Sequence, residues 1–329
     1  TLLKTQSLID NQWTDATTGD TIDVTNPFDN QVIATIPSLE KSQVIDAVAI
    51  AHKAQIDWAQ KTANERAAIL NNWADLIDQN KEDLATIMTA EQGKPITESR
   101  GEIGYANSFI RWFAEEGKRI YGDIIPSTNK DLRYVVLKQP IGVCAAITPW
   151  NFPAAMITRK VAPALAAGCS IIVKPATETP LTALALGELA IRAGLPAGLL
   201  QIVTGKSSVI GEVLTQDERI HKLSFTGSTE VGRVLMSQCA STVKKLSMEL
   251  GGNAPFIVFD DADLEKAATG LIASKYRNAG QTCVCANRVY VQSGIKDKFL
   301  AIFKQKVEAL KVGNGMTEGV NIGPLINKD

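Results

Sequence analysis

From residue 141 onward the chain alternates between short apolar runs and longer helix-like stretches, and this pattern limits the folds that the chain can adopt. The apolar runs lie at 141–148, 169–173, 200–203 and 222–225, and the helix-like stretches lie between them at 154–167, 181–193 and 209–214. Strands that alternate with helices build a parallel sheet covered by helices. Ligands of such sheets bind at the carboxyl ends of the strands, so we expect a site among the residues that follow these runs.

The regions on either side of this pattern predict further elements. Residues 41–119 are expected to be mostly helical, because their apolar residues recur at helical spacing. Residues 121–139 predict an extended hairpin. A strand at 255–259 and a helix at 262–279 are expected to lead into a turn that contains a cysteine.

Composition and charge exclude several classes of function. The chain has 329 residues, enough for a large core and two domains, and its net charge of -1 gives no general attraction to nucleic acid. The uncharged stretch 161–173 is too short to span a bilayer and contains Pro163 and Gly168, so no membrane partner is expected. The five cysteines have no framework-like spacing, which favours a reducing, cytoplasmic compartment. His52 and His221 are too far apart in the sequence to suggest a histidine-rich metal site or a Ser-His-Asp hydrolase, and no metal is expected.

One cysteine and one glutamate lie in glycine-containing segments that suit covalent catalysis. Cys283 ends the run Asn-Ala-Gly-Gln-Thr-Cys at 278–283, and Glu249 lies in Met-Glu-Leu-Gly-Gly-Asn at 248–253. A thiol can form a thioester, and a carboxylate can activate the water that cleaves it. Each residue alone has an ordinary alternative, since a free cysteine is usually a small packing residue and a buried glutamate is usually paired.

The candidate nucleotide site does not have the usual glycine fingerprint. The nearest candidate is the segment 225–232, in which Gly227 and Ser228 follow a predicted strand and open a predicted helix. The N-terminus of a helix favours phosphate. Lys174 ends another predicted strand, where it could hold ribose hydroxyls. Taken alone, Gly227 is better explained by an ordinary strand-to-helix turn, and Lys174 by a solvent-facing lysine at the end of a strand.

Five segments in one order resemble the aldehyde dehydrogenase superfamily and, within it, the succinate-semialdehyde dehydrogenases. They are Pro-Trp-Asn-Phe-Pro at 149–153, Lys-Pro-Ala at 174–176, Phe-Thr-Gly-Ser at 225–228, Glu-Leu-Gly-Gly at 249–252 and Gly-Gln-Thr-Cys at 280–283. The resemblance covers essentially the whole chain. It implies an α/β fold with a variant Rossmann doubly wound sheet, part of a second α/β catalytic domain and an oligomerisation hairpin.

The resemblance also implies how the chain is divided. Residues 1–120 and 141–249 would form the cofactor-binding domain, 121–140 the oligomerisation hairpin and 250–329 the start of an incomplete catalytic domain. The chain is therefore expected to be truncated at its C-terminus, and the full-length protein to be a homodimer or homotetramer.

By position, the resemblance assigns the catalytic roles to three residues. Cys283 matches the nucleophile and Glu249 the general base. The side chain of Asn151, with the backbone N–H of Cys283, matches the donors that hold the oxyanion. The residues that match cofactor contacts are Trp150, Lys174, Thr177, Gly227, Ser228 and Leu250.

Three positions bear on the choice of cofactor and substrate. Three residues after the position of Lys174, the family often has a glutamate, and this glutamate binds the ribose 2′-hydroxyl and repels a 2′-phosphate. In this chain that position is the neutral Thr177. NADP is therefore expected to be preferred, with NAD as the alternative. Arg159 and Arg277 match arginines that hold the distal carboxylate of succinate semialdehyde. The implied reaction is oxidation of succinate semialdehyde to succinate. Glutarate semialdehyde, one methylene longer, is an alternative, since a methylene discriminates by only about 1–3 kcal/mol.

Other interpretations stay open at this point. Cys285 lies two residues after Cys283 and could form a disulfide with it, although a packing role is at least as reasonable. The chain could be an enzyme that forms acyl-CoA or a thiol hydrolase, but Glu249 argues against the first because it serves attack by water. It could also be a fragment that binds nucleotide without catalysis.

Overall fold

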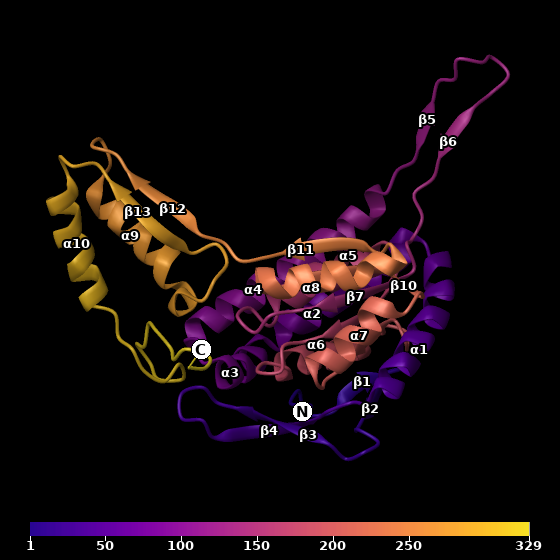
Figure 1. Ribbon diagram of the computed structural model, residues 1–329, viewed down its shortest axis with the longest axis horizontal. Coiled ribbons are helices and arrows are strands. Elements are labelled where there is room, and N and C mark those ends of the chain that lie inside the picture. Colours follow the sequence, from indigo (N-terminus) through magenta and orange to yellow (C-terminus); the bar gives the residue numbers. More distant parts are fainter. Residues whose placement is uncertain (329) are drawn as a thin grey trace.

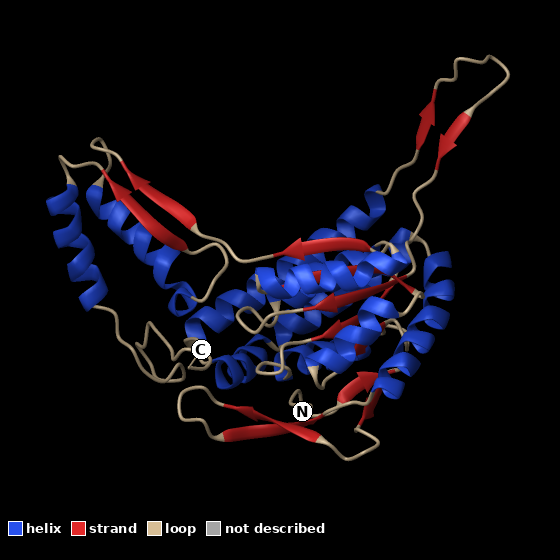
Figure 2. Ribbon diagram, viewed as in Figure 1, coloured by secondary structure: helices blue, strands red, loops and turns tan. Residues whose placement is uncertain are grey.

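The computed structural model describes residues 1–328 and contains a central sheet with helices on both faces (Figures 1 and 2). The seven strands of the sheet have the order β11-β10-β7-β8-β9-β1-β2. The parallel strands are β11 (Lys245–Glu249), β10 (Ile220–Thr226), β7 (Val143–Ile147), β8 (Ser170–Lys174) and β9 (Leu200–Ile202), and the antiparallel strands β1 (Ser7–Ile9) and β2 (Gln12–Thr14) complete one edge. The parallel sheet predicted from the alternating pattern is confirmed.

Helices cover both faces of this sheet. One face carries α5 (Ala155–Ala166) and α6 (Leu181–Arg192), backed by α2 (Ala63–Gln79), α3 (Lys81–Gln92) and α4 (Ile96–Glu116); the other carries α1 (Lys41–Gln60), α7 (Ser207–Gln216) and α8 (Thr229–Cys239). Successive side chains of a strand point to opposite faces. In β7, Ala146 accordingly joins the core under α5 and α6, while Val143 and Ala145 join the core under α1 and α7.

A smaller unit follows the central sheet. Strands β12 (Ala254–Val258) and β13 (Ala286–Val291) pair in parallel, and α9 (Leu264–Tyr276) and α10 (Lys296–Glu308) pack beside them. Val258, Leu271 and Phe299 belong to the separate core of this unit. Figure 1 shows the unit set apart from the central sheet and joined to β11 by a single extended segment.

Two hairpins lie outside the sheets described above. One pairs β3 (Thr21–Thr25) with β4 (Val32–Pro37), and the other pairs β5 (Asp123–Ile125) with β6 (Tyr134–Val136). The second hairpin, which the sequence predicts, projects far from the rest of the chain (Figure 1). No helix within residues 1–328 is long and apolar enough to cross a membrane.

The structure differs from the sequence prediction at two places near the candidate site. Strand β11 was not predicted, because its residues alternate between exposed and half-buried and form no apolar run. The helix expected at 262–279 ends at Tyr276, since Asn278 and Ala279 adopt left-handed φ angles of 52° and 56°. The cysteine turn therefore begins with a tight reversal of the backbone.

Candidate active site

The predicted site residues gather at one edge of the central sheet. Lys174 and Glu249 are the last residues of β8 and β11, Asn151 lies in the loop after β7, and Gly227 and Ser228 follow β10 directly. These four strands are parallel neighbours, so their carboxyl ends meet at the same edge. The topology thus brings together residues that are far apart in the sequence.

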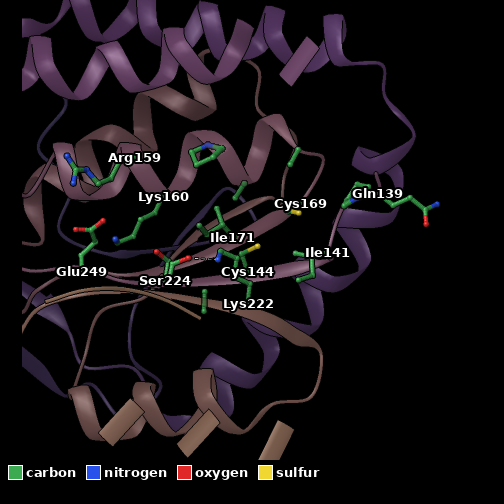
Figure 3. Close-up of a pocket in the computed structure, with 16 residues that line it drawn as sticks. Gln139, Ile141, Cys144, Arg159, Lys160, Cys169, Ile171, Lys222, Ser224 and Glu249 are labelled. Atoms are coloured by element: carbon green, nitrogen blue, oxygen red, sulfur yellow. Dashed lines mark hydrogen bonds between the residues drawn. The ribbon is translucent and has the colours of Figure 1, made fainter. Parts of the chain in front are cut away.

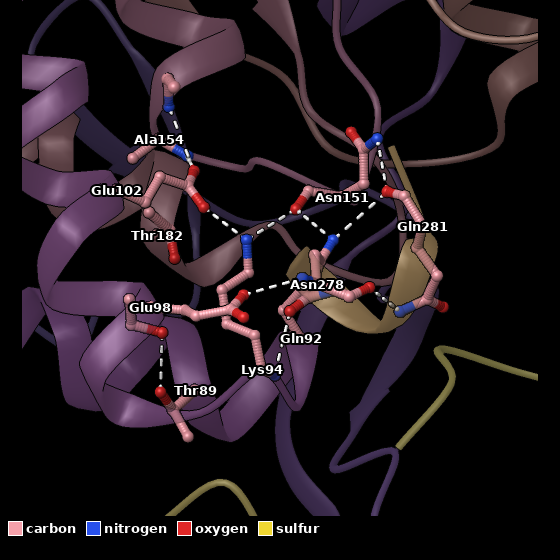
Figure 4. A network of polar contacts seen from close by, with 12 residues as sticks. Thr89, Gln92, Lys94, Glu98, Glu102, Asn151, Ala154, Thr182, Asn278 and Gln281 are labelled. Atoms are coloured by element: carbon pink, nitrogen blue, oxygen red, sulfur yellow. Dashed lines mark hydrogen bonds and ion pairs between the residues drawn. The ribbon is translucent and has the colours of Figure 1, made fainter. Parts of the chain in front are cut away.

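Hydrogen bonds connect Asn151 to the segment that leads to the cysteine (Figure 4). Its Nδ2 donates to the carbonyl of Gln281 at 3.0 Å, and its own carbonyl accepts from Asn278 Nδ2 at 3.0 Å. The amide nitrogen of an asparagine carries two protons, and the bond to Gln281 uses one of them. The other remains available for an oxyanion.

Cys283 lies in a turn packed against the residues that follow Glu249. Its side chain is half-buried and free. A Cβ at Gly252 would collide with the carbonyl oxygen of Cys283, so only glycine permits this approach of the two backbones. The cysteine turn and the segment that follows β11 therefore touch directly.

Glu249 faces a cavity of about 450 Å³ between α5 and the sheet (Figure 3). The same cavity is lined by Arg159 and Lys160 from α5. Burial lowers the pKa of Lys160 to about 8, while the charge of Glu249 acts in the opposite direction, and the Lys160 ammonium donates to Thr226 Oγ1 at 2.6 Å. Glu249 is exposed, so water can reach its carboxylate.

Tyr105 is close to both predicted substrate arginines: it accepts a hydrogen bond from Arg159 and lines a cavity together with Arg277. Arg159 donates from Nη2 to the Tyr105 hydroxyl at 2.7 Å, and its guanidinium lies 4.8 Å from the centre of the Phe109 ring. Arg277 lies 5.0 Å from the centre of the Phe152 ring and lines a second cavity together with Tyr105. Arg159 therefore lines the same cavity as Glu249, and Arg277 lines a cavity that also contains Phe152, the residue after Asn151.

The predicted cofactor residues form two groups at the same edge. Lys174 donates to Thr177 Oγ1 at 3.3 Å, and burial lowers the pKa of this lysine to about 8, against the opposing charge of Glu178. Thr177 and Glu178 line a smaller cavity of about 140 Å³.

The second group lies at the N-terminus of α8. Ser228 is its N-cap and accepts from the N–H of Val231, while the N–H of Gly227 donates to the carbonyl of Glu249 at 3.0 Å. Leu250 packs over Gly232 of this helix, where its Cδ2 lies 2.6 Å from the position of an added Cβ. Trp150, half-buried, precedes Asn151 in the loop after β7.

Cys285 does not face the same space as Cys283. Its side chain is buried, and its thiol donates to the carbonyl of Lys275 at 3.3 Å. Both cysteines are free. A disulfide between them stays a prediction.

Several residues at the site were not singled out from the sequence. They are Lys94, Glu98, Glu102, Tyr105, Lys160 and Asn278. Lys94 lies in the region expected to be mostly helical, and nothing in the sequence marks it as buried. Lys160 directly follows Arg159 and carries no sequence signal of its own.

Comparison with known proteins identifies the class. The profile of the aldehyde dehydrogenase family matches residues 13–329. The chain belongs to the aldehyde dehydrogenase family. It is 58% identical to a succinate-semialdehyde dehydrogenase [NADP(+)] of Escherichia coli K12, over 99% of this chain and 68% of that protein.

Two further relatives are similarly close. A glutarate-semialdehyde dehydrogenase of Pseudomonas putida is 58% identical over 99% of this chain and 68% of its own length. The crystal structure of an aldehyde dehydrogenase from Brucella melitensis biovar abortus 2308 superposes with a TM-score of 0.99 at 63% identity, covering 99% of this chain and 68% of that one. The predicted variant Rossmann fold of this family is confirmed.

Proposed function

We propose that the protein oxidises succinate semialdehyde to succinate and reduces NADP. The observation that carries this proposal is a pair of guanidinium groups: Arg159 lines the cavity that Glu249 also lines, and Arg277 lines a cavity that contains Phe152, the residue after Asn151. An aldehyde with a carboxylate at its far end can pair with them while its carbonyl lies near Cys283. The relatives named for succinate and glutarate semialdehydes are in keeping with this choice.

The chemistry assigns one role to each catalytic side chain. The Cys283 thiolate attacks the aldehyde carbon, and the free N–H of the Asn151 amide, with the backbone N–H of Cys283, stabilises the oxyanion. Bound NADP supplies the hydride acceptor, and the substrate is left as a thioester on Cys283. Glu249 then takes a proton from water, which attacks the thioester and releases the acid.

The residues at the sheet edge suit NADP. The N-terminus of α8 can receive pyrophosphate through the N–H groups of its first turn other than that of Val231, which the Ser228 hydroxyl caps. Beside Lys174, Thr177 leaves room and adds no charge that would repel a 2′-phosphate. Thr177→Glu should move the preference toward NAD, and unchanged selectivity would count against this assignment.

The division of the chain is part of the same proposal. Residues 1–120 and 141–249 act as the cofactor-binding domain, 250–329 belong to a catalytic domain, and the hairpin at 121–140 joins copies of the chain into an oligomer. The exposed apolar side chains of the hairpin support the last point. Free cysteines are in keeping with a reducing compartment such as the cytoplasm.

The first experiment mixes the protein with succinate semialdehyde and either NADP or NAD and follows the absorbance of the reduced nicotinamide. We expect faster turnover with NADP. Arg159→Ala and Arg277→Ala should each raise the KM for succinate semialdehyde about 10-fold or more, while the KM for an uncharged aldehyde of equal length stays constant. Equal KM changes for both aldehydes would contradict the carboxylate clamp.

Glutarate semialdehyde is the second candidate substrate. The similarity to the Pseudomonas putida relative favours it, and the added methylene changes binding by only about 1–3 kcal/mol. The ratio of kcat/KM for the two semialdehydes, measured with the same cofactor, decides between them.

A further inference from the structure

A buried ion pair lies directly behind Asn151 and has no role in the chemistry described above (Figure 4). The Lys94 ammonium is 2.5 Å from Glu102 Oε2, and the two side chains are 1% and 2% exposed. The same ammonium donates to the carbonyl of Asn151 at 2.7 Å and lies 4.2 Å from the centre of the Phe152 ring. Lys94 therefore makes two contacts with the Asn151–Phe152 segment and one with the carboxylate of Glu102.

Glu102 holds the other end of this segment. Its Oε1 accepts the N–H groups of Ala154 at 3.0 Å and Ala155 at 3.2 Å, where α5 begins. A carboxylate at the start of a helix satisfies free N–H groups and interacts favourably with the helix dipole. The ion pair thus fixes Asn151 both through its own carbonyl and through the helix that follows it.

The same face of α4 also holds the turn that leads to Cys283. Glu98, one helical turn before Glu102, accepts the backbone N–H of Asn278 at 2.9 Å. Asn278 has a φ of 52° and donates from its side chain to the carbonyl of Asn151. A non-glycine residue in this conformation is strained and depends on such contacts. One helix therefore sets the position of both segments that meet an oxyanion.

We propose that Lys94 and Glu102 are positioning residues, which hold the Asn151 amide where it meets the oxyanion formed at Cys283. The inference rests on the proposed role of Asn151. A buried ion pair is weak evidence for a role in stability, because well-packed apolar residues often serve as well. What distinguishes this pair is that its contacts converge on the backbone on both sides of Asn151.

The test uses p-nitrophenyl acetate, an ester that reacts without any nicotinamide. The Cys283 thiolate attacks the ester carbon, an oxyanion forms on the carbonyl oxygen, and p-nitrophenolate leaves as an acetyl thioester is made. The first equivalent of p-nitrophenolate therefore reports on attack by Cys283 and on the oxyanion site, without nicotinamide and before the thioester is hydrolysed. A failed substrate or cofactor proposal would leave this measurement intact.

The decisive measurement is a double-mutant cycle. The variant Lys94→Met/Glu102→Gln removes both charges together, and we expect acylation to slow about 10- to 100-fold, against about 10²- to 10³-fold for Asn151→Ala. When the ion-pair substitutions are combined with Asn151→Ala, the acylation rate should be close to that of Asn151→Ala alone. The reason is that the ion pair acts through Asn151, so it has little effect once that side chain is gone.

Glu91 provides a matched control. It is also a buried carboxylate at the start of a helix, where it accepts the N–H groups of Leu181 at 2.6 Å and Thr182 at 2.8 Å. Its helix, α6, carries none of the catalytic side chains. Glu91→Gln should lower the melting temperature, as the ion-pair variant does, and leave acylation within about twofold of the unaltered protein.

Two results would overturn the positioning role. The first is an acylation rate in the Lys94→Met/Glu102→Gln variant that equals the original rate. The second is a cycle in which the loss from the ion-pair substitutions and the loss from Asn151→Ala multiply, as expected if the ion pair contributes only to stability. A protein that releases no p-nitrophenolate would overturn the oxyanion site and this inference with it. If the double variant does not fold, Lys94→Gln, which keeps one donor, is carried through the same cycle and judged by the same criteria.

Discussion

At the scale of single residues, the most specific expectation concerns Glu249. Removing its charge should spare attack by Cys283 and hydride transfer but slow thioester hydrolysis. Glu249→Gln should therefore give one rapid equivalent of reduced nicotinamide followed by a steady rate about 10²- to 10⁴-fold lower. Stopped-flow absorbance separates the two phases.

Cys283→Ser is the control for this experiment, because it should remove the rapid phase as well. If Glu249→Gln abolished the rapid phase too, the glutamate would act before the thioester forms, and the proposed division of roles would be wrong.

A second residue-scale expectation concerns Lys174, whose pKa burial lowers to about 8. A lysine carries its charge below its pKa and loses it above, so contact with a 2′-phosphate should weaken as the pH rises through about 8. The KM for NADP should then increase up to about 10-fold per pH unit, while the KM for NAD changes less. Initial rates between pH 7 and about 9.5 measure both.

Lys174→Arg tests the cause, because an arginine keeps its charge throughout this range. The variant should flatten the pH dependence for NADP. Parallel changes in the KM of both cofactors would contradict a contact between Lys174 and the phosphate.

At the scale of elements, the close approach of the segment after β11 to the cysteine turn predicts a sharp difference between neighbouring glycines. A Cβ at Gly252 collides with the carbonyl oxygen of Cys283, whereas a Cβ at Gly251 meets its nearest neighbour, Thr229 Oγ1, at 3.7 Å. Gly252→Ala should displace the turn and lower kcat at least about 10-fold, since small displacements of reacting groups are costly. Gly251→Ala should cost less than about threefold. Equal losses would mean that the backbone contact does not position Cys283.

The sequence predicts the elements whose signal is local and not those set by tertiary contacts. The apolar runs identify β7, β8, β9 and β10. The signal is continuous in β7 and β8, which are buried on both faces, whereas in β10 His221 is exposed and Lys222 and Ser224 are half-buried. Strand β11 lies at the sheet edge with alternate residues exposed, so its strand character comes from pairing with β10.

The same distinction applies to the candidate site. Cys283, Glu249 and Asn151 lie in recognisable segments, and the structure places each at the sheet edge where such segments are expected to meet. Lys94 and Glu102 carry no such signal, because an ordinary lysine or glutamate becomes informative only when it is seen to be buried and paired.

At the scale of the whole molecule, the glycine-rich segment after α10 returns to the break between α3 and α4. The carbonyl of Gly315 accepts the N–H of Ile96, and a Cβ at Gly315 would lie 2.5 Å from the carbonyl oxygen of Lys94. The N–H of Ile326 donates to Gln281 Oε1 at 3.0 Å. The smaller unit is therefore tied to the central sheet through the same residues that position the candidate site.

The projecting hairpin leads to the last prediction, which concerns assembly. Ile124 and Val135 lie opposite each other in the register of β5 and β6 and are 79% and 62% exposed. An apolar ribbon of this kind is a poor surface for a monomer, and its free strand edges can pair with another copy. We expect light scattering to give a mass of at least two chains. Ile124→Lys/Val135→Lys should lower that mass to one chain without changing the melting temperature of the central sheet, whereas Asp131→Lys, at the hairpin tip, should leave it unaltered. A double variant that keeps its mass would place the contact between copies elsewhere, and a wild-type monomer would remove the hairpin from assembly altogether.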